Sequence, residues 1–86
     1  MIINPYDIAK LNRQHPGAVL RQLEKGEQHK AGSTYWCGYW HQSYTVEQIR
    51  RDVPIWGTLY RCRWDDGRVT EHATPLDPRR DAEILC

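Results

Sequence analysis

The sequence contains no phenylalanine, a single methionine and only three cysteines, and no long apolar run. A helix that crosses a membrane needs roughly 20 apolar residues, so the composition predicts a soluble chain with no membrane partner. Cys37, Cys62 and Cys86 form no close pairs and are odd in number, which does not suit the disulfide framework of a small secreted domain. We therefore expect reduced thiols in a cytoplasmic protein.

The sequence patterns of the common catalytic chemistries are missing too. Neither a Gly-rich phosphate loop nor a nucleophile with a base and an orienting acid can be found, so we expect no enzyme, no cofactor and no catalytic residue. Cys37, His41, Cys62 and His72 are residue types that bind zinc. On one strand, however, Cys37 and His41 lie about 13 Å apart. Because Cys62 and His72 are expected on opposite sheet faces, we predict no metal site.

What the chain does contain is aromatic bulk and balanced charge. Four Trp and five Tyr supply much of the apolar volume, and twelve Lys and Arg stand against eleven Asp and Glu. Eighty-six residues suffice for one core, so we expect a single domain over residues 1–86. A net charge of +1 argues against a protein that coats nucleic acid by charge alone, although a local basic face remains open.

The N-terminal residues 4–26 predict a helical hairpin. Asn4 is a good N-cap and Pro5 suits the first helical position, so a first helix should begin here and end near Arg13. A second helix is predicted over residues 16–25, with Gly26 as its stop. Residues 7–23 resemble a helix-turn-helix, a resemblance carried by Ile8, Ala9, Leu11, Ala18, Val19, Arg21 and Leu23. The resemblance implies DNA contacts from Arg21 and Gln22, whereas the simpler interpretation is a helix pair packed on a sheet.

An antiparallel sheet is predicted over residues 34–74. The run of residues 35–40 has rings on both faces, which predicts burial under helices on one side and an interior or a binding surface on the other. Gly38 is expected to mark a bulge or a close backbone approach. Residues 43–49 favour a strand, but Thr45 and Gln48 also fit a capping box for a short helix. Residues 50–54 are then expected to form a loop.

The two strands around Asp66-Gly67 form the most clearly predicted hairpin, because a type I′ turn needs positive φ at both central residues. With these two residues at the turn, Trp64 lies opposite Val69 and Tyr60 opposite Ala73. The predicted core face carries Trp56, Thr58, Tyr60, Cys62, Trp64, Val69 and Ala73, and the predicted wet face carries Arg61, Arg63, Asp65, Arg68, Thr70 and His72. Glu71 falls on the core side of this register, which indicates an edge strand.

The remaining residues, 75–86, are predicted to form a C-terminal tail or a short helix. Pro75 and Pro78 interrupt the sheet, and Asp77 can cap a helical turn that starts at Pro78.

Two surfaces are candidates for binding. Arg61, Arg63 and Arg68 with His72 form a polar stripe flanked by Arg50 and Arg51, which is either a solvated face balanced by Asp65 and Glu47 or a site for nucleic-acid phosphates. Exposed aromatic rings are typical anchors of protein interfaces, and the candidate rings are Tyr35, Trp36, Trp40 and Trp56. We predict a small non-catalytic protein-binding module, with nucleic-acid binding through the arginine face or the helix pair as the alternative.

Residues 44–77 resemble the strand-turn-strand part of small SH3-like or Tudor-like barrels of bacterial and phage proteins. The resemblance is carried by Tyr44, Val46, Trp56, Tyr60, the run of residues 63–68, and His72. It implies a binding module, and the arginine-rich composition is similar to that of phage or bacterial accessory proteins that modulate a host factor in the host cytoplasm. The expected fold class is α+β, with the N-terminal helical hairpin packed on a small antiparallel sheet or an SH3-like partial barrel of three to four strands.

Overall fold

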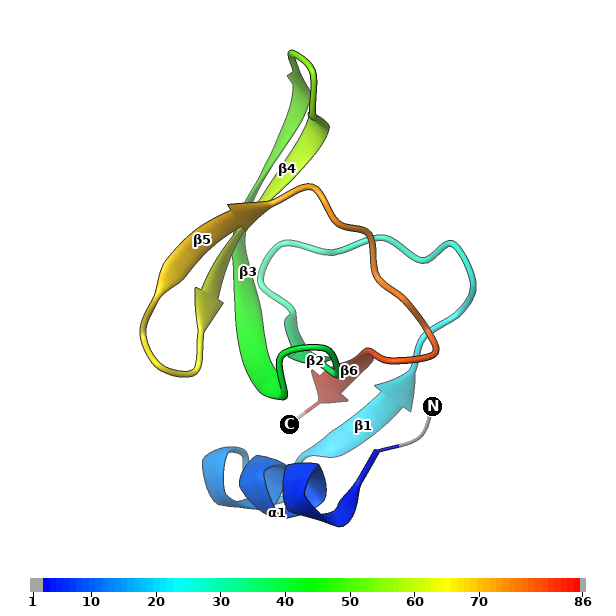
Figure 1. Cartoon of the computed structure of the whole chain (residues 1–86), viewed down its shortest axis with the longest axis vertical. Helices are drawn as coiled ribbons and strands as arrows, with labels where there is room; N and C mark the ends of the chain where they lie inside the picture. Colours follow the sequence, from blue (N-terminus) through cyan, green and yellow to red (C-terminus); the bar gives the residue numbers. More distant parts are fainter. Residues whose placement is uncertain (1–2, 86) are drawn as a thin grey trace.

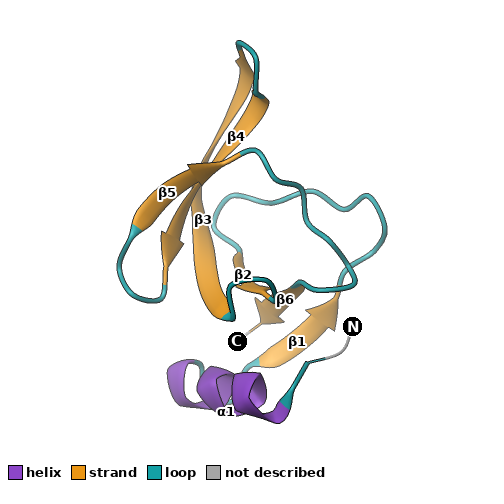
Figure 2. Ribbon diagram, in the orientation of Figure 1, coloured by secondary structure: helices purple, strands orange, loops and turns teal. Residues whose placement is uncertain are grey.

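A computed structural model describes residues 3–85 as one helix and a single six-stranded antiparallel sheet (Figures 1 and 2). The spatial order of the strands is β1-β6-β2-β3-β4-β5. The elements are α1 (Pro5–Gln14), β1 (Val19–Gln22), β2 (Thr34–Cys37), β3 (Gln42–Val53), β4 (Gly57–Trp64), β5 (Val69–His72) and β6 (Ala82–Leu85).

The first predicted helix is confirmed. The side chain of Asn4 accepts a hydrogen bond from the backbone N–H of Asp7 at 2.9 Å, and Pro5 occupies the first turn. The helix ends at Gln14, immediately before the His15-Pro16 pair, because a residue that precedes proline is disfavoured in the α region.

The predicted second helix is wrong, and with it the helical hairpin and the helix-turn-helix resemblance. Val19–Gln22 form β1, which pairs antiparallel with β6. Arg21 therefore contacts Glu83 of β6, with its Nε 2.7 Å from the carboxylate, instead of projecting from a recognition helix. This segment of four residues has no strong intrinsic preference for helix or strand, so pairing with β6 determines its conformation.

The predicted C-terminal tail or helix is wrong as well. Ala82–Leu85 form β6, which lies between β1 and β2 in the middle of one half of the sheet. Ala82, Glu83 and Ile84 are at most 5% exposed. Helix-forming residues here adopt a strand because two neighbouring strands take up their backbone hydrogen bonds. Cys86 lies outside the described residues.

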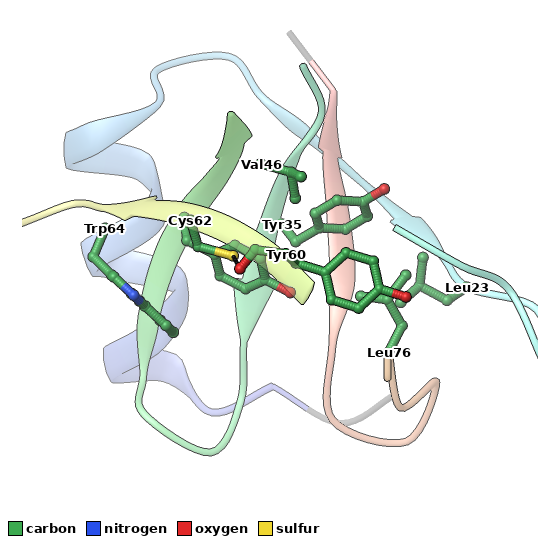
Figure 3. Close-up of a cluster of buried hydrophobic side chains, with 8 residues drawn as sticks. Leu23, Tyr35, Val46, Tyr60, Cys62, Trp64 and Leu76 are labelled. Carbon is green, nitrogen blue, oxygen red and sulfur yellow. Dashed lines mark hydrogen bonds between the residues drawn. The ribbon is translucent and has the colours of Figure 1, made fainter. Parts of the chain in front are cut away.

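Adjacent aromatic residues of β2 face opposite sides of the sheet, and both are buried. Trp36 packs with Leu11 and Ile84 beneath α1, whereas Tyr35 belongs to the larger core on the other face. The prediction was burial under helices on one side and an interior or a binding surface on the other, and for Tyr35 and Trp36 the second face is an interior. The larger core, shown in Figure 3, consists of Leu23, Tyr35, Tyr44, Val46, Tyr60, Cys62, Trp64 and Leu76.

The strand β2 is shorter than predicted because the chain turns back after Cys37. His41 donates its backbone N–H to the carbonyl of Cys37 at 2.9 Å and has a positive φ of 56°. The close approach predicted at Gly38 is confirmed, since a Cβ atom there would overlap the backbone carbonyl oxygen of Arg80. Gly38 thereby allows the β2–β3 turn to touch the segment that leads into β6.

The strand predicted over residues 43–49 is confirmed, but it is longer than expected and includes residues predicted as a loop. β3 runs from Gln42 to Val53, with register shifts between Val46 and Gln48 and between Arg50 and Val53. Its end and the start of β4 project beyond the rest of the sheet as a two-stranded arm (Figure 1).

The predicted register of the β4–β5 hairpin is wrong by one residue. Arg63 pairs with Val69 and Tyr60 with His72, because the loop has three residues and ends at Gly67, whose φ is 89°. A three-residue loop of this kind is the second common hairpin connection. The alternation of β4 is confirmed, with its rings and Cys62 inward, but on β5 the faces are exchanged, so that Thr70 and His72 face inward and Glu71 outward.

Candidate functional site

The predicted arginine stripe exists in part, and its charges are largely paired. Arg61 and Arg63 are exposed on β4, and Glu47 lies beside both, 3.0 Å from the Nε of Arg63 and 4.0 Å from that of Arg61. The irregularity in β3 after Val46 places this glutamate there. Arg68 pairs with Asp66 of its own turn at 2.8 Å. The stripe is therefore close to a neutral, solvated surface.

His72 does not belong to that stripe. The one-residue shift of β5 turns its ring inward, where its Nε2 hydrogen-bonds the Thr70 hydroxyl and its edge meets the Trp64 ring at a centroid distance of 5.6 Å. Burial lowers the pKa of His72 below its ordinary value. His72 therefore acts as part of an aromatic wall and not as a surface cation.

The four candidate rings separate into two buried and two exposed side chains. Tyr35 and Trp36 are at most 1% exposed and contribute to the two cores, so they have no surface to offer a partner. Trp40 is 60% exposed in the β2–β3 turn and Trp56 is 63% exposed at the tip of the arm. The structure thus places the two exposed rings in separate regions.

Trp40 lines a cavity of about 260 Å³. We call this cavity the aromatic pocket. Its wall is formed by residues of the β2–β3 turn, of β3, β4 and β5, and of the two long loops before β2 and β6. The lining residues are His29, Cys37, Tyr39, Trp40, Tyr44, Cys62, Trp64, His72, Thr74, Pro75, Arg80 and Asp81.

The rings of the aromatic pocket are fixed against one another. The centroids of Tyr44 and Trp64 are 4.9 Å apart, and Tyr39 meets Trp40 edge-on at 5.0 Å. The indole N–H of Trp64 donates to the Thr70 hydroxyl at 2.6 Å. Aromatic pairs of this geometry hold each other's orientation, so the pocket is formed before any ligand arrives.

Two charged residues, Arg80 and Asp81, line the wall, and Asp81 is the buried one, at only 6% exposed. Its carboxylate accepts hydrogen bonds from the backbone N–H groups of Asp77 at 3.0 Å and Gly38 at 3.3 Å. Within residues 3–85 it has no ion pair, because the neighbouring Arg80 pairs with Asp77 and stacks on the Tyr39 ring at 5.6 Å. Burial raises the pKa of Asp81 despite the two backbone donors. Arg80 acts on Asp81 only through its charge at a distance, and a buried carboxylate without a direct ion pair favours a positively charged ligand.

His29 adds an unused polar atom to the same cavity. One ring nitrogen, Nε2, lies 2.7 Å from the Tyr44 hydroxyl, whereas the buried Nδ1 has no hydrogen-bond partner among the described residues. Burial, with a small repulsion from His72, lowers the pKa of His29 to about 4, so the ring is neutral at pH 7. A neutral imidazole adds no positive charge to the cavity.

The two thiols in the wall are poor nucleophiles. Burial raises the pKa of Cys62 to about 12 and also raises that of Cys37, and a protonated thiol neither attacks substrates nor binds metals well. Between residues 3 and 85 no cluster of three or more side chains suited to a metal ion occurs. The chemistry that the pocket offers is thus aromatic stacking and the attraction of a cation.

Sequence reasoning found Trp40 and His72 but missed the rest of the site. Asp81 and Arg80 lie in the segment predicted as a tail, and His29 lies between the predicted helical hairpin and the predicted sheet, so no pattern places them near the aromatic strand. Gly38 was the available signal, since a glycine between aromatic residues indicated that another segment comes close.

Comparison with protein-family models, with characterised proteins and with solved structures finds no match for this chain. None of the helices within residues 3–85 has the length and apolarity needed to cross a membrane.

Proposed function

We propose that this chain is a small non-catalytic binding module that holds another protein by taking one basic side chain of that protein into the aromatic pocket. The observation that carries the proposal is Asp81, a buried carboxylate without an ion pair in a cavity lined by aromatic rings. An ammonium or guanidinium group in the pocket would compensate this charge. The faces of Tyr44 and Trp64 would add cation–π attraction, worth about 0.5–2 kcal/mol.

The dimensions of the pocket agree with a single inserted side chain. A cavity of 260 Å³ has room for about nine water molecules at roughly 30 Å³ each, which is enough for one long side chain and its end group. Tyr39 and Trp40 are each at least 60% exposed beside the cavity. Rings placed in this way can cover the backbone on either side of the inserted residue, as aromatic residues commonly do at interfaces.

Binding of nucleic acid through the arginine stripe is the weaker alternative. A phosphate would have to compete with Glu47 for Arg61 and Arg63, and with Asp66 for Arg68. Charge-driven binding would then be weak and steeply dependent on salt. Titration with short single- and double-stranded DNA at low salt, observed by tryptophan fluorescence, measures this directly.

The experiment that tests the pocket compares ligands that differ only in charge. The probes are the N-acetyl amides of lysine, of arginine and of norleucine, which has the lysine stem without the ammonium group. Amide chemical shifts of the full chain are followed while each is added. We expect the two basic probes to shift residues around the pocket and to bind at least tenfold more tightly than norleucine.

Variants at two carboxylates complete the test. Asp81→Asn keeps an acceptor oxygen but removes the charge, and we expect it to lower the affinity for both basic probes at least tenfold. Asp52→Asn, on the arm, serves as the matched control and should leave binding unchanged. Equal binding of lysine and norleucine amides, or full binding by D81N, would show that the carboxylate does not select the ligand.

A further inference from the structure

The arm is a second surface, independent of the aromatic pocket. We define it as residues 48–59, the part of the β3–β4 hairpin that lies beyond the neighbouring strands. β2 pairs with β3 only at Gln42–Thr45, and β5 pairs with β4 only at Tyr60–Arg63. The arm therefore has two unpaired edges and projects from the sheet, as Figure 1 shows. A two-stranded ribbon is marginally stable in water without further contacts.

The tip of the arm exposes a large apolar side chain on a strained backbone. Ile55 is 98% exposed and has a φ of 73°. It follows Pro54 in a tight turn, at a position where glycine or asparagine is usual because the left-handed region disfavours a β-branched residue. An exposed isoleucine in this conformation contributes nothing to the monomer that a glycine would not provide. Its side chain is better explained by contact with something outside the monomer.

Beside the tip lies a shallow hollow of about 340 Å³. Its apolar lining is Trp56, Leu59 and Ala73, and its rim is an exposed ion pair between Arg50 and Glu71 with a nitrogen–oxygen distance of 2.6 Å. We call Ile55 and the hollow together the arm patch. It combines an apolar projection, an apolar hollow, one positive charge and one negative charge.

These features make the arm patch complementary to itself. A two-fold axis through the patch would place the tip of each chain against the hollow of the other, and it would bring Arg50 of one chain to Glu71 of the other in both directions. A nucleic acid or an anionic membrane would instead require an excess of positive charge, and the rim has none. We infer that two copies of this chain associate through their arm patches into a symmetric dimer.

The contact area is limited to the two arm patches, so we expect a rapidly exchanging dimer with a dissociation constant on the order of 0.1 mM. The test is sedimentation equilibrium of the full chain between about 10 µM and 1 mM. We expect the average mass to rise from that of one chain toward that of two. A mass that stays at one chain up to 1 mM would overturn the inference and would leave the patch to a different partner.

Charge reversal tests the two-fold arrangement itself. Arg50→Glu gives a rim with two negative charges and Glu71→Arg a rim with two positive charges, so each variant alone should associate at least tenfold more weakly than the wild type. An equimolar mixture of the two should regain dimers, because each negative rim then faces a positive one. Both residues are exposed, and far-UV circular dichroism verifies that the variants are folded.

Two further variants separate specific from general effects. Lys25→Glu makes the same charge change in the loop after β1 and should dimerise as the wild type does. Ile55→Asn keeps the turn, since asparagine tolerates positive φ, and should weaken association at least fivefold. If the mixture of R50E and E71R stays monomeric, or if K25E weakens association equally, the proposed contact is wrong.

Discussion

Trp36 and Trp56 lie only twenty residues apart in the chain, yet the first is 1% exposed beneath α1 and the second is 63% exposed on the arm. Around Trp36 the sheet is covered on both faces, and the side chains of Asn4, His15 and Lys10 each make a hydrogen bond there. On the arm, apolar groups face solvent and the backbone at Ile55 is strained. The region around Trp36, which we call the base, thus supplies the stability. The arm keeps an exposed apolar side chain and a strained turn, which selection for stability alone would remove.

The largest expected effect comes from truncating the two tryptophans in turn. Trp36→Ala should destabilise the fold by about 3–5 kcal/mol, because it leaves a cavity between α1 and β6. In a domain of this size such a loss leaves little or no folded protein. Trp56→Ala should change the free energy of unfolding by less than about 1 kcal/mol. Urea denaturation followed by circular dichroism compares the two, and equal losses would contradict the division into base and arm.

The next largest effect concerns the dependence of the free energy of unfolding on pH. The unfolded chain protonates His29 near pH 6.5, whereas the folded chain does so only near pH 4. Unfolding therefore takes up a proton between these values, and the stability should fall as the pH is lowered through this window, by about 2 kcal/mol at pH 5. Urea midpoints at pH 7 and pH 5 measure the loss. In His29→Gln the difference between the two pH values should shrink, and an unchanged difference would assign the loss to other groups.

The smallest effect should have the opposite sign. Ile55→Asn places a residue that tolerates positive φ at the tip of the arm, and it should raise the free energy of unfolding by about 1 kcal/mol. The same urea experiment measures it at low protein concentration, where chains are monomeric. Val19→Asn is a useful control, since Val19 is 64% exposed on an edge strand of ordinary backbone conformation. A loss of stability in I55N would mean that the isoleucine stabilises the isolated chain.

Local patterns predicted those parts of the fold that local contacts determine. The helix at Pro5 and the inward rings of β4 depend on a cap and on alternation, both of which are visible within a few residues. β1 and β6 could not be found in this way, because Leu20 and Ile84 are partners separated by more than sixty positions. Each segment alone is four residues long and compatible with a helix.

The candidate site could not be predicted from the sequence for a related reason. Asp81 is buried only because β6 enters the sheet and because Gly38 lets the preceding segment approach the β2–β3 turn. The register of β5 depended on whether the loop at Asp66-Gly67 has two residues or three, and the choice decides which face His72 occupies. A two-residue loop and a three-residue loop both agree with the turn preferences of the sequence. The packing around Trp64 therefore determines which of them forms.

The position of β6 also bears on how the chain acquires its structure during synthesis. β6 is the last of the strands described within residues 3–85, yet it lies between β1 and β2, which do not pair with each other. On the ribosome, β1 therefore has no partner strand until residues 82–85 have emerged. The pairing of β1 with β6 is therefore a late, long-range step in the formation of the sheet.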